Sequence, residues 1–84
     1  METIAAYSVY LVRCADGTLY TGLARDADAR VRAHNTGKGA KYTAARRPVV
    51  LVYREACRSR SAALKREHEI KTWSRARKEA LIDP

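Results

Sequence analysis

The chain has 84 residues, 46% of them hydrophobic, which suits one small domain over residues 1–84 with its core at about 7–82 and excludes intrinsic disorder. Its net charge of +8 is uneven, because residues 25–84 hold 16 basic against seven acidic side chains. This imbalance favours a polyanion such as nucleic acid as the partner, although basic surface residues can also serve solubility alone.

A β-hairpin is predicted at the start of the chain. Residues 7–14 are rich in β-branched and aromatic side chains, and Asp16-Gly17 follows them. Glycine adopts the positive φ that tight turns require, so this pair predicts the turn. The first strand is apolar on both faces, which indicates a central position in a sheet. The second strand, residues 18–23, is more polar and is expected at an edge.

A helix and a third strand are predicted next. Asp26 can cap the free backbone N–H groups of a helix over residues 26–36, which Gly37 ends. We expect a loop from Gly37 to Thr43. Beyond Pro48, residues 49–53 form a β-branched run that predicts the third strand.

Two helices are predicted to complete the chain. Ser59 or Ser61 can cap a helix that continues to about Trp73, and Ser74 can cap a final short helix that ends near Ile82. The predicted fold class is therefore α+β, with a three-stranded antiparallel sheet flanked by helices in the order β-β-α-β-α-α.

Four residues on the predicted sheet and first helix are candidates for chemistry. Tyr10 and Tyr20 lie on the paired strands, while Arg30 and His34 are four residues apart and share a helix face. Each has an ordinary explanation: the tyrosines can pack in strands, Arg30 can pair with Asp26, and a charged His34 can favour the helix C-terminus. A phenol, a guanidinium and an imidazole on one surface could instead bind and cut a phosphodiester.

Glu67 is the fifth candidate, because its helical neighbours at spacings of three and four are mostly apolar. Ala63, Leu64 and Ile70 share its face, together with Lys71. A carboxylate on such a stripe loses solvation and tends to meet a cation or a donor. An ion pair with Lys71 is the simple explanation, and a bound metal ion is the functional one.

Basic residues after the first helix predict contacts with a nucleic-acid backbone. The loop from Gly37 to Lys41 has two glycines and two lysines, which lets backbone and ammonium groups approach a phosphate, although a flexible helix exit is equally compatible. Basic residues farther along the chain extend this surface and are expected to contact phosphates rather than bases, namely Arg46, Arg47, Arg54, Arg58, Arg60, Lys65 and Arg66. The predicted nucleic-acid contacts are Lys38, Lys41, Tyr42, Arg46, Arg47 and Lys71.

The sequence also limits the compartment and other chemistries. Cys14 and Cys57 are too few for a disulfide framework or a four-ligand zinc site. Residues 1–6 lack the basic and apolar regions of a signal peptide, and no run approaches the ~20 apolar residues of a membrane span. We therefore expect a cytoplasmic protein that does not bind membranes.

The order of these motifs resembles the GIY-YIG nuclease family, and in particular its small single-domain bacterial members. The resemblance covers residues 7–82 and includes the segments 8–10, 19–22, 37–43, 47–49 and 67–71. It extends to the N-terminal catalytic domain of excision-repair nuclease subunits, although Leu23 stands where that branch has lysine. Ser8, Val9 and Thr21 also depart from the motif residues.

The resemblance implies a metal-dependent endonuclease that hydrolyses DNA, with a role in DNA repair. It implies catalytic roles for Tyr10, Tyr20, Arg30, His34 and Glu67, of which Glu67 binds Mg²⁺, with Mn²⁺ as a substitute. DNA is favoured over RNA, and target choice would come from a homodimer, a targeting protein or the shape of structured or damaged DNA. The alternative is a nucleic-acid-binding module of the same fold with little or no catalysis.

Overall fold

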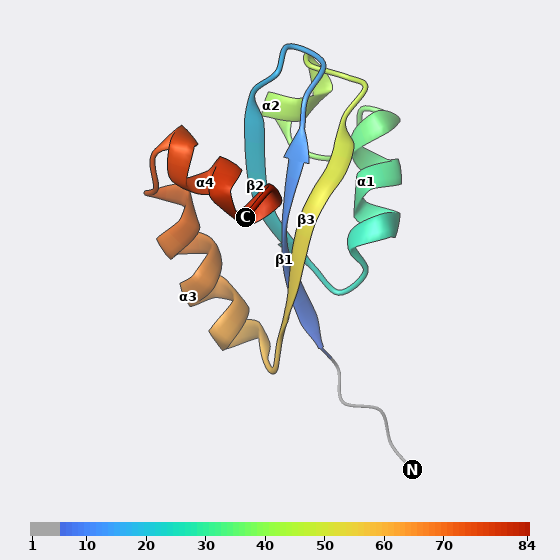
Figure 1. The fold of residues 1–84 in the computed structure, drawn as a ribbon. Coiled ribbons are helices and arrows are strands. Elements are labelled where there is room, and N and C mark those ends of the chain that lie inside the picture. The colour runs from blue at the N-terminus through green and yellow to red at the C-terminus, as the bar shows by residue number, and fades with distance from the viewer. Residues whose placement is uncertain (1–5) are drawn as a thin grey trace.

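A three-stranded antiparallel sheet lies at the centre of the structure, a computed structural model that describes residues 6–84 (Figure 1). Its strands are arranged in the order β2-β1-β3. In chain order the elements are β1 (Tyr7–Arg13), β2 (Leu19–Ala24), α1 (Ala27–Asn35), α2 (Lys41–Ala44), β3 (Val50–Cys57), α3 (Arg60–Lys71) and α4 (Arg75–Ile82). The predicted α+β class, sheet and central first strand are confirmed, while the start of the chain, predicted to lack a signal peptide, lies outside the described residues.

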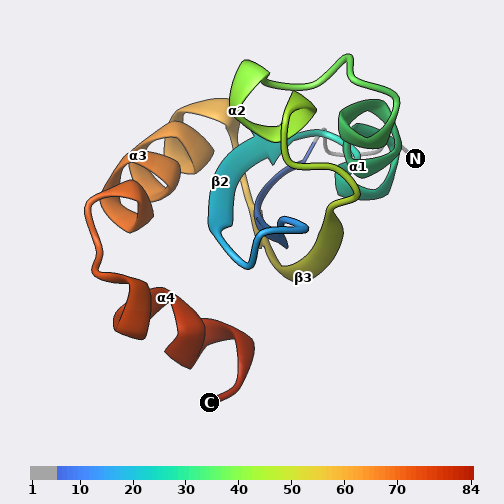
Figure 2. The same cartoon turned by 90° about the horizontal axis from the view of Figure 1, so that it is seen from above.

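Helices cover both faces of the sheet, α1 and α2 on one side and α3 and α4 on the other (Figures 1 and 2). Strand β1 supplies both cores, since Tyr10 and Val12 pack towards α1 while Val9 and Leu11 pack towards α3 and α4. All four side chains are at most 1% exposed. The apolar alternation on both faces of β1 therefore reflects a strand buried from both sides.

Turn and cap residues set the boundaries of the elements as predicted. Gly17 has φ of 86° in the β1–β2 turn, and Asp16 accepts hydrogen bonds from the backbone and side chain of Thr18. Asp26 accepts from the Ala29 N–H at the start of α1. Ser59, rather than Ser61, caps α3, and Ser74 caps α4.

Two parts of the sequence-based prediction were wrong. Residues 41–43, expected in a loop, belong to the short helix α2, in which the Ala44 N–H and the Thr43 hydroxyl both donate to the Ala40 carbonyl. Such a turn is too short to show helical periodicity. Strand β3 also continues to Cys57, past the expected end at residue 53. The residues after Tyr53 pair with β1 although their side chains are more polar than those of residues 49–53.

The part of the chain that the structure describes contains no helix long and apolar enough to cross a bilayer.

Candidate active site

A buried chain of hydrogen bonds joins the sheet to α1 and α2. The Tyr10 hydroxyl lies 2.8 Å from His34 Nε2, and His34 Nδ1 lies 2.6 Å from the Thr43 hydroxyl. His34 is 1% exposed and Thr43 is fully buried. Because the Thr43 hydroxyl donates to the Ala40 carbonyl at 2.9 Å, it is best placed to accept from a protonated Nδ1. The Ala40 N–H also faces Nδ1, which would favour the other tautomer, but at 3.4 Å it is the weaker of the two contacts. The tautomer assigned from the shorter contact leaves Nε2 free to accept the Tyr10 proton.

Two glycines make room for this chain. A Cβ atom on Gly22 of β2 would lie 2.5 Å from the Tyr10 hydroxyl, and one on Gly39 would collide with the His34 imidazole. Any larger residue at either position must therefore displace a member of the hydrogen-bonded chain. Their role is close approach, since neither residue has a positive φ.

Burial shifts the pKa values of both ring groups away from the charged forms. Burial, and secondly the nearby Tyr20, raises the pKa of Tyr10 to about 12, while Arg30 acts in the opposite direction. Burial, and secondly the positive charge of Arg30, lowers the pKa of His34. The imidazole is therefore neutral at pH 7 and able to accept a proton. This contradicts the simple explanation that a charged His34 stabilises the helix C-terminus.

Aromatic side chains form one wall beside His34. The Tyr20 ring meets the imidazole edge-on at 5.4 Å between centroids and stacks on Tyr42 at 6.0 Å. The Arg46 guanidinium lies 3.8 Å above the Tyr42 ring and also pairs with Asp16. Tyr42 is 38% exposed. The wall therefore offers a partly exposed aromatic face next to a cation, a combination on which nucleic-acid bases stack.

Arg30 lies on α1 one turn before His34 and close enough to Tyr10 to affect its pKa. The sequence also suggested that Arg30 pairs with Asp26. The structure of residues 6–84 does not contain this ion pair, because the Asp26 carboxylate caps the helix instead. Arg30 is exposed and its charge is available to an anion. Glu67 on α3 is also near enough to raise the pKa of Tyr10.

Glu67 forms the ion pair that the sequence suggested as its simple explanation. Its carboxylate lies 3.3 Å from Lys71 Nζ, and its side chain is 17% exposed. No group of three His, Cys, Asp or Glu residues within the described range could hold a metal ion. A lone carboxylate suits Mg²⁺, which keeps several waters and shares substrate phosphates, but does not suit a zinc site of four protein ligands.

Most of the predicted nucleic-acid contacts lie just after the C-terminal end of α1. Lys38 and Lys41 are exposed there, on either side of Gly39. Arg47 donates to the Ala44 carbonyl and at 3.4 Å to the Asn35 carbonyl, so part of its guanidinium holds α1 and α2 together. The structure thus places five of the six predicted contacts near α2, whereas Lys71 lies on α3 beside Glu67.

Sequence reasoning missed the roles of Thr43, Gly22 and Gly39. All three lie in segments that carry the family resemblance, but none has an ionisable group that would mark it as chemical. Their signal is spatial, because each acts on Tyr10 or His34 across the fold. Covariation with His34 would be the signal to seek in related sequences.

Comparisons with known proteins identify the family of this chain. Residues 6–80 match the GIY-YIG catalytic domain. A UPF0213 protein of Staphylococcus aureus strain COL is 58% identical over 77 residues, covering 92% of this chain and 94% of the relative. Among solved structures, the UPF0213 protein BH0048 from Bacillus halodurans is similar at 44% identity, covering 92% of this chain and 82% of that one, with a TM-score of 0.59. The protein EF2693 from E. faecalis is similar at 39% identity, covering 95% and 85%, with a TM-score of 0.62.

Proposed function

This chain belongs to the GIY-YIG catalytic domain family, within the UPF0213 group of small bacterial proteins, and on that premise we propose that it is a metal-dependent endonuclease that hydrolyses phosphodiester bonds in DNA. The observation that carries the proposal is the buried contact between Tyr10 and a neutral His34, with Arg30 beside it. Any buried tyrosine hydroxyl needs a hydrogen-bond partner, but here that partner is an imidazole with a lowered pKa, which can take up a proton, rather than a backbone carbonyl.

Tyr10 and His34 together act as the base. An isolated phenol with a pKa of about 12 keeps its proton at pH 7 and would be a poor base. Because Tyr10 is 1% exposed, its proton cannot pass readily to bulk water, and His34 Nε2 at 2.8 Å is the acceptor. As Tyr10 takes a proton from the attacking water, it passes its own to His34. Tyr20 forms the wall against which the substrate lies.

Arg30 and Glu67 supply the charges for the reaction. The Arg30 guanidinium offsets negative charge that develops on the phosphorus oxygens. Glu67 would hold Mg²⁺, with Mn²⁺ as a substitute, and the bound cation supplies charge stabilisation at the leaving oxygen. Lys71, the present partner of Glu67, would turn towards the substrate backbone.

The test is cutting of supercoiled and branched DNA by purified protein in Mg²⁺, with EDTA as the control. We expect Glu67→Gln and Arg30→Gln each to reduce the rate by at least about 100-fold. The matched variants are Glu69→Gln, on the same helix and paired with Arg66, and Arg32→Gln, two residues from Arg30. Equal rates for Glu67→Gln and Glu69→Gln would contradict the assignment.

The same substrate panel addresses the target of the enzyme. We propose structured or damaged DNA as the substrate, with selection by a homodimer or a targeting protein, because the family resemblance includes excision-repair nucleases. Preferential cutting of branched or lesion-containing duplexes over linear duplex and RNA is the expected result. Uniform cutting of all of them would reject this target.

The second candidate function is a nucleic-acid-binding module of the same fold without catalysis. The ion pair between Glu67 and Lys71 favours it, because this pairing neutralises the carboxylate that, among residues 6–84, acts on the pKa of Tyr10. This candidate requires strongly salt-dependent binding and no Mg²⁺-dependent product from any substrate of the panel.

A further inference from the structure

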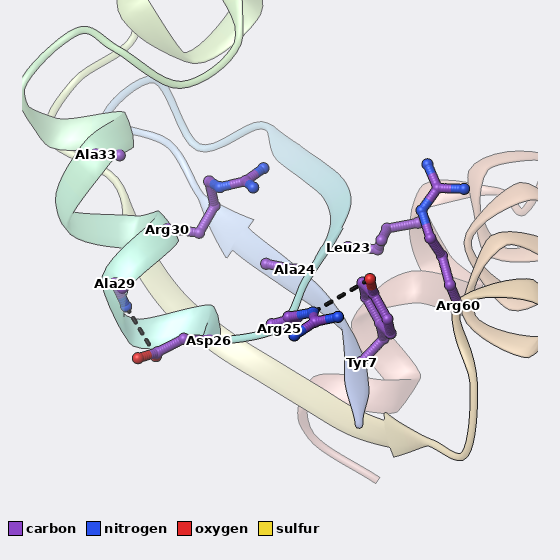
Figure 3. Close-up of a pocket in the computed structure, with 9 residues that line it drawn as sticks. All are labelled: Tyr7, Leu23, Ala24, Arg25, Asp26, Ala29, Arg30, Ala33 and Arg60. Atoms are coloured by element: carbon purple, nitrogen blue, oxygen red, sulfur yellow. Dashed lines mark hydrogen bonds between the residues drawn. The ribbon is translucent and has the colours of Figure 1, made fainter. Parts of the chain in front are cut away.

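A pocket of about 580 Å³ opens beside the candidate active site, between the first half of α1 and the start of α3 (Figure 3). Four of its nine lining residues have small or apolar side chains, and two of these, Ala29 and Ala33, are four residues apart on α1. Alanine at these positions leaves space that a longer side chain would fill. Three arginines, Arg25, Arg30 and Arg60, come from three different segments to line the same pocket.

None of these three arginines forms an ion pair within residues 6–84, although several others do, such as Arg54 with Asp28 and Arg66 with Glu55. Arg25, Arg30 and Arg60 are all exposed. Three like charges around one hollow repel each other unless an anion enters. The one acid in the lining, Asp26, already uses its carboxylate to cap α1.

Tyr7 holds one of these arginines in place. The Arg25 Nε–H donates to the Tyr7 hydroxyl at 3.2 Å, and the guanidinium lies 5.2 Å from the centre of the Tyr7 ring (Figure 3). This contact uses Nε and leaves both terminal NH₂ groups for another acceptor. A guanidinium fixed in this way loses less conformational freedom when it binds a planar or tetrahedral oxyanion.

Arg30 links the pocket to the reaction site, because it lines the pocket and also lies beside Tyr10 and His34. We propose that the pocket between Arg25, Arg30 and Arg60 binds a phosphodiester group of the substrate strand next to the bond that is cut, with its sugar against the alanines of α1. This inference rests on the proposed function for the identity of the strand. It assigns Arg25 and Arg60 as binding residues and Tyr7 as a positioning residue.

The experiment measures binding of a fluorescent DNA oligonucleotide in EDTA over a series of salt concentrations, so that cutting does not contribute. We expect Arg25→Gln and Arg60→Gln each to weaken binding by about 5- to 10-fold, and the double variant to lower the slope of log Kd against log salt by about one. The control Arg32→Gln removes the same charge from an exposed site of α1 outside the pocket and should change Kd less than about twofold. Thermal unfolding verifies that all variants fold.

Several outcomes separate this inference from the proposed nuclease activity. If the pocket variants bind like Arg32→Gln while Glu67→Gln still loses cutting, the pocket assignment is wrong and the nuclease stands. If the pocket variants lose binding and no substrate is cut, the pocket stands and the nuclease is wrong. If a deoxynucleoside monophosphate or inorganic phosphate competes as well as the oligonucleotide per phosphate, the pocket is a free-nucleotide or phosphate site and the strand assignment is overturned.

Discussion

Replacing Thr43 with valine tests the hydrogen-bonded chain without changing the shape of the side chain. The substitution removes the hydroxyl that lies 2.6 Å from His34 Nδ1 and leaves that nitrogen buried without this partner. A buried donor without an acceptor costs about 1–3 kcal/mol. The Ala40 carbonyl still accepts from the Ala44 N–H, so only one group is orphaned. For a chain of this length, each kcal/mol lowers the melting temperature by about 4–8 °C.

The imidazole can recover only part of this cost by moving its proton, because the replacement contact is longer than the one that is lost. With the proton on Nε2, Nδ1 can accept from the Ala40 N–H, which lies 3.4 Å away. Nε2 would then donate to the Tyr10 hydroxyl instead of accepting from it. The cutting rate should therefore fall by about 10- to 100-fold with unchanged DNA affinity, and Thr43→Ser should restore it.

Thr21 provides the matched control for Thr43. It is also a buried threonine, 3% exposed, but within the described range its hydroxyl has no hydrogen-bond partner. Thr21→Val should therefore be neutral or stabilising. Urea unfolding measures the two free energies, and ¹⁵N chemical shifts of the His34 ring report the tautomer. Equal unfolding free energies for Thr43→Val and Thr21→Val, or a parent His34 protonated at Nε2, would refute the reasoning.

Three further predictions concern Tyr10 and His34. Gly22→Ala should force the Tyr10 ring to move by about 1 Å and destabilise the protein by about 1–3 kcal/mol. Its control is Val52→Ala, which alters packing on the other face of the sheet and should lose a similar free energy of unfolding in urea. Gly22→Ala should reduce the cutting rate far more than this control does. Because the pKa of Tyr10 is raised to about 12, the unfolded chain loses this proton first, so stability should fall as pH rises above about 10, and less steeply in Tyr10→Phe. Because the pKa of His34 is lowered, the unfolded chain takes up this proton first, so stability should fall as pH drops below about 6.5; an equally steep acid limb in His34→Gln would contradict this.

Local chemistry explains why much of the fold could be predicted from sequence. Asp16-Gly17, Asp26 and Ser74 each act on backbone groups within three residues, so their effect is visible in a short window. The helix α2 could not be predicted in this way, because its four residues are held by a hydroxyl of Thr43 that also serves His34.

In the candidate site, too, local arrangements could be predicted from sequence and long-range contacts could not. Arg30 and His34 could be paired from their spacing, since one helix places them together. The contact of His34 with Tyr10, 24 residues away in the chain, and the placement of Arg25 and Arg60 around one pocket depend on how β1, α1 and α3 pack. No local pattern encodes such meetings, and the resemblance to a family supplied only those residues that its motif contains.

Within the part of the chain that the structure describes, Glu67 is the carboxylate that acts on the pKa of Tyr10, and its ion pair has a consequence for the proposed metal site. Glu67 is already balanced by Lys71 at 3.3 Å, so a cation must compete with an ammonium group for it. A polyanionic strand changes this balance, because its phosphates attract Lys71 and add oxygen ligands of the kind that Mg²⁺ prefers. If Glu67 holds the cation as proposed, metal and nucleic acid would then strengthen each other's binding by the same factor, since the coupling between two ligands is reciprocal. A lone, paired carboxylate is thus compatible with a metal centre that is completed by its substrate.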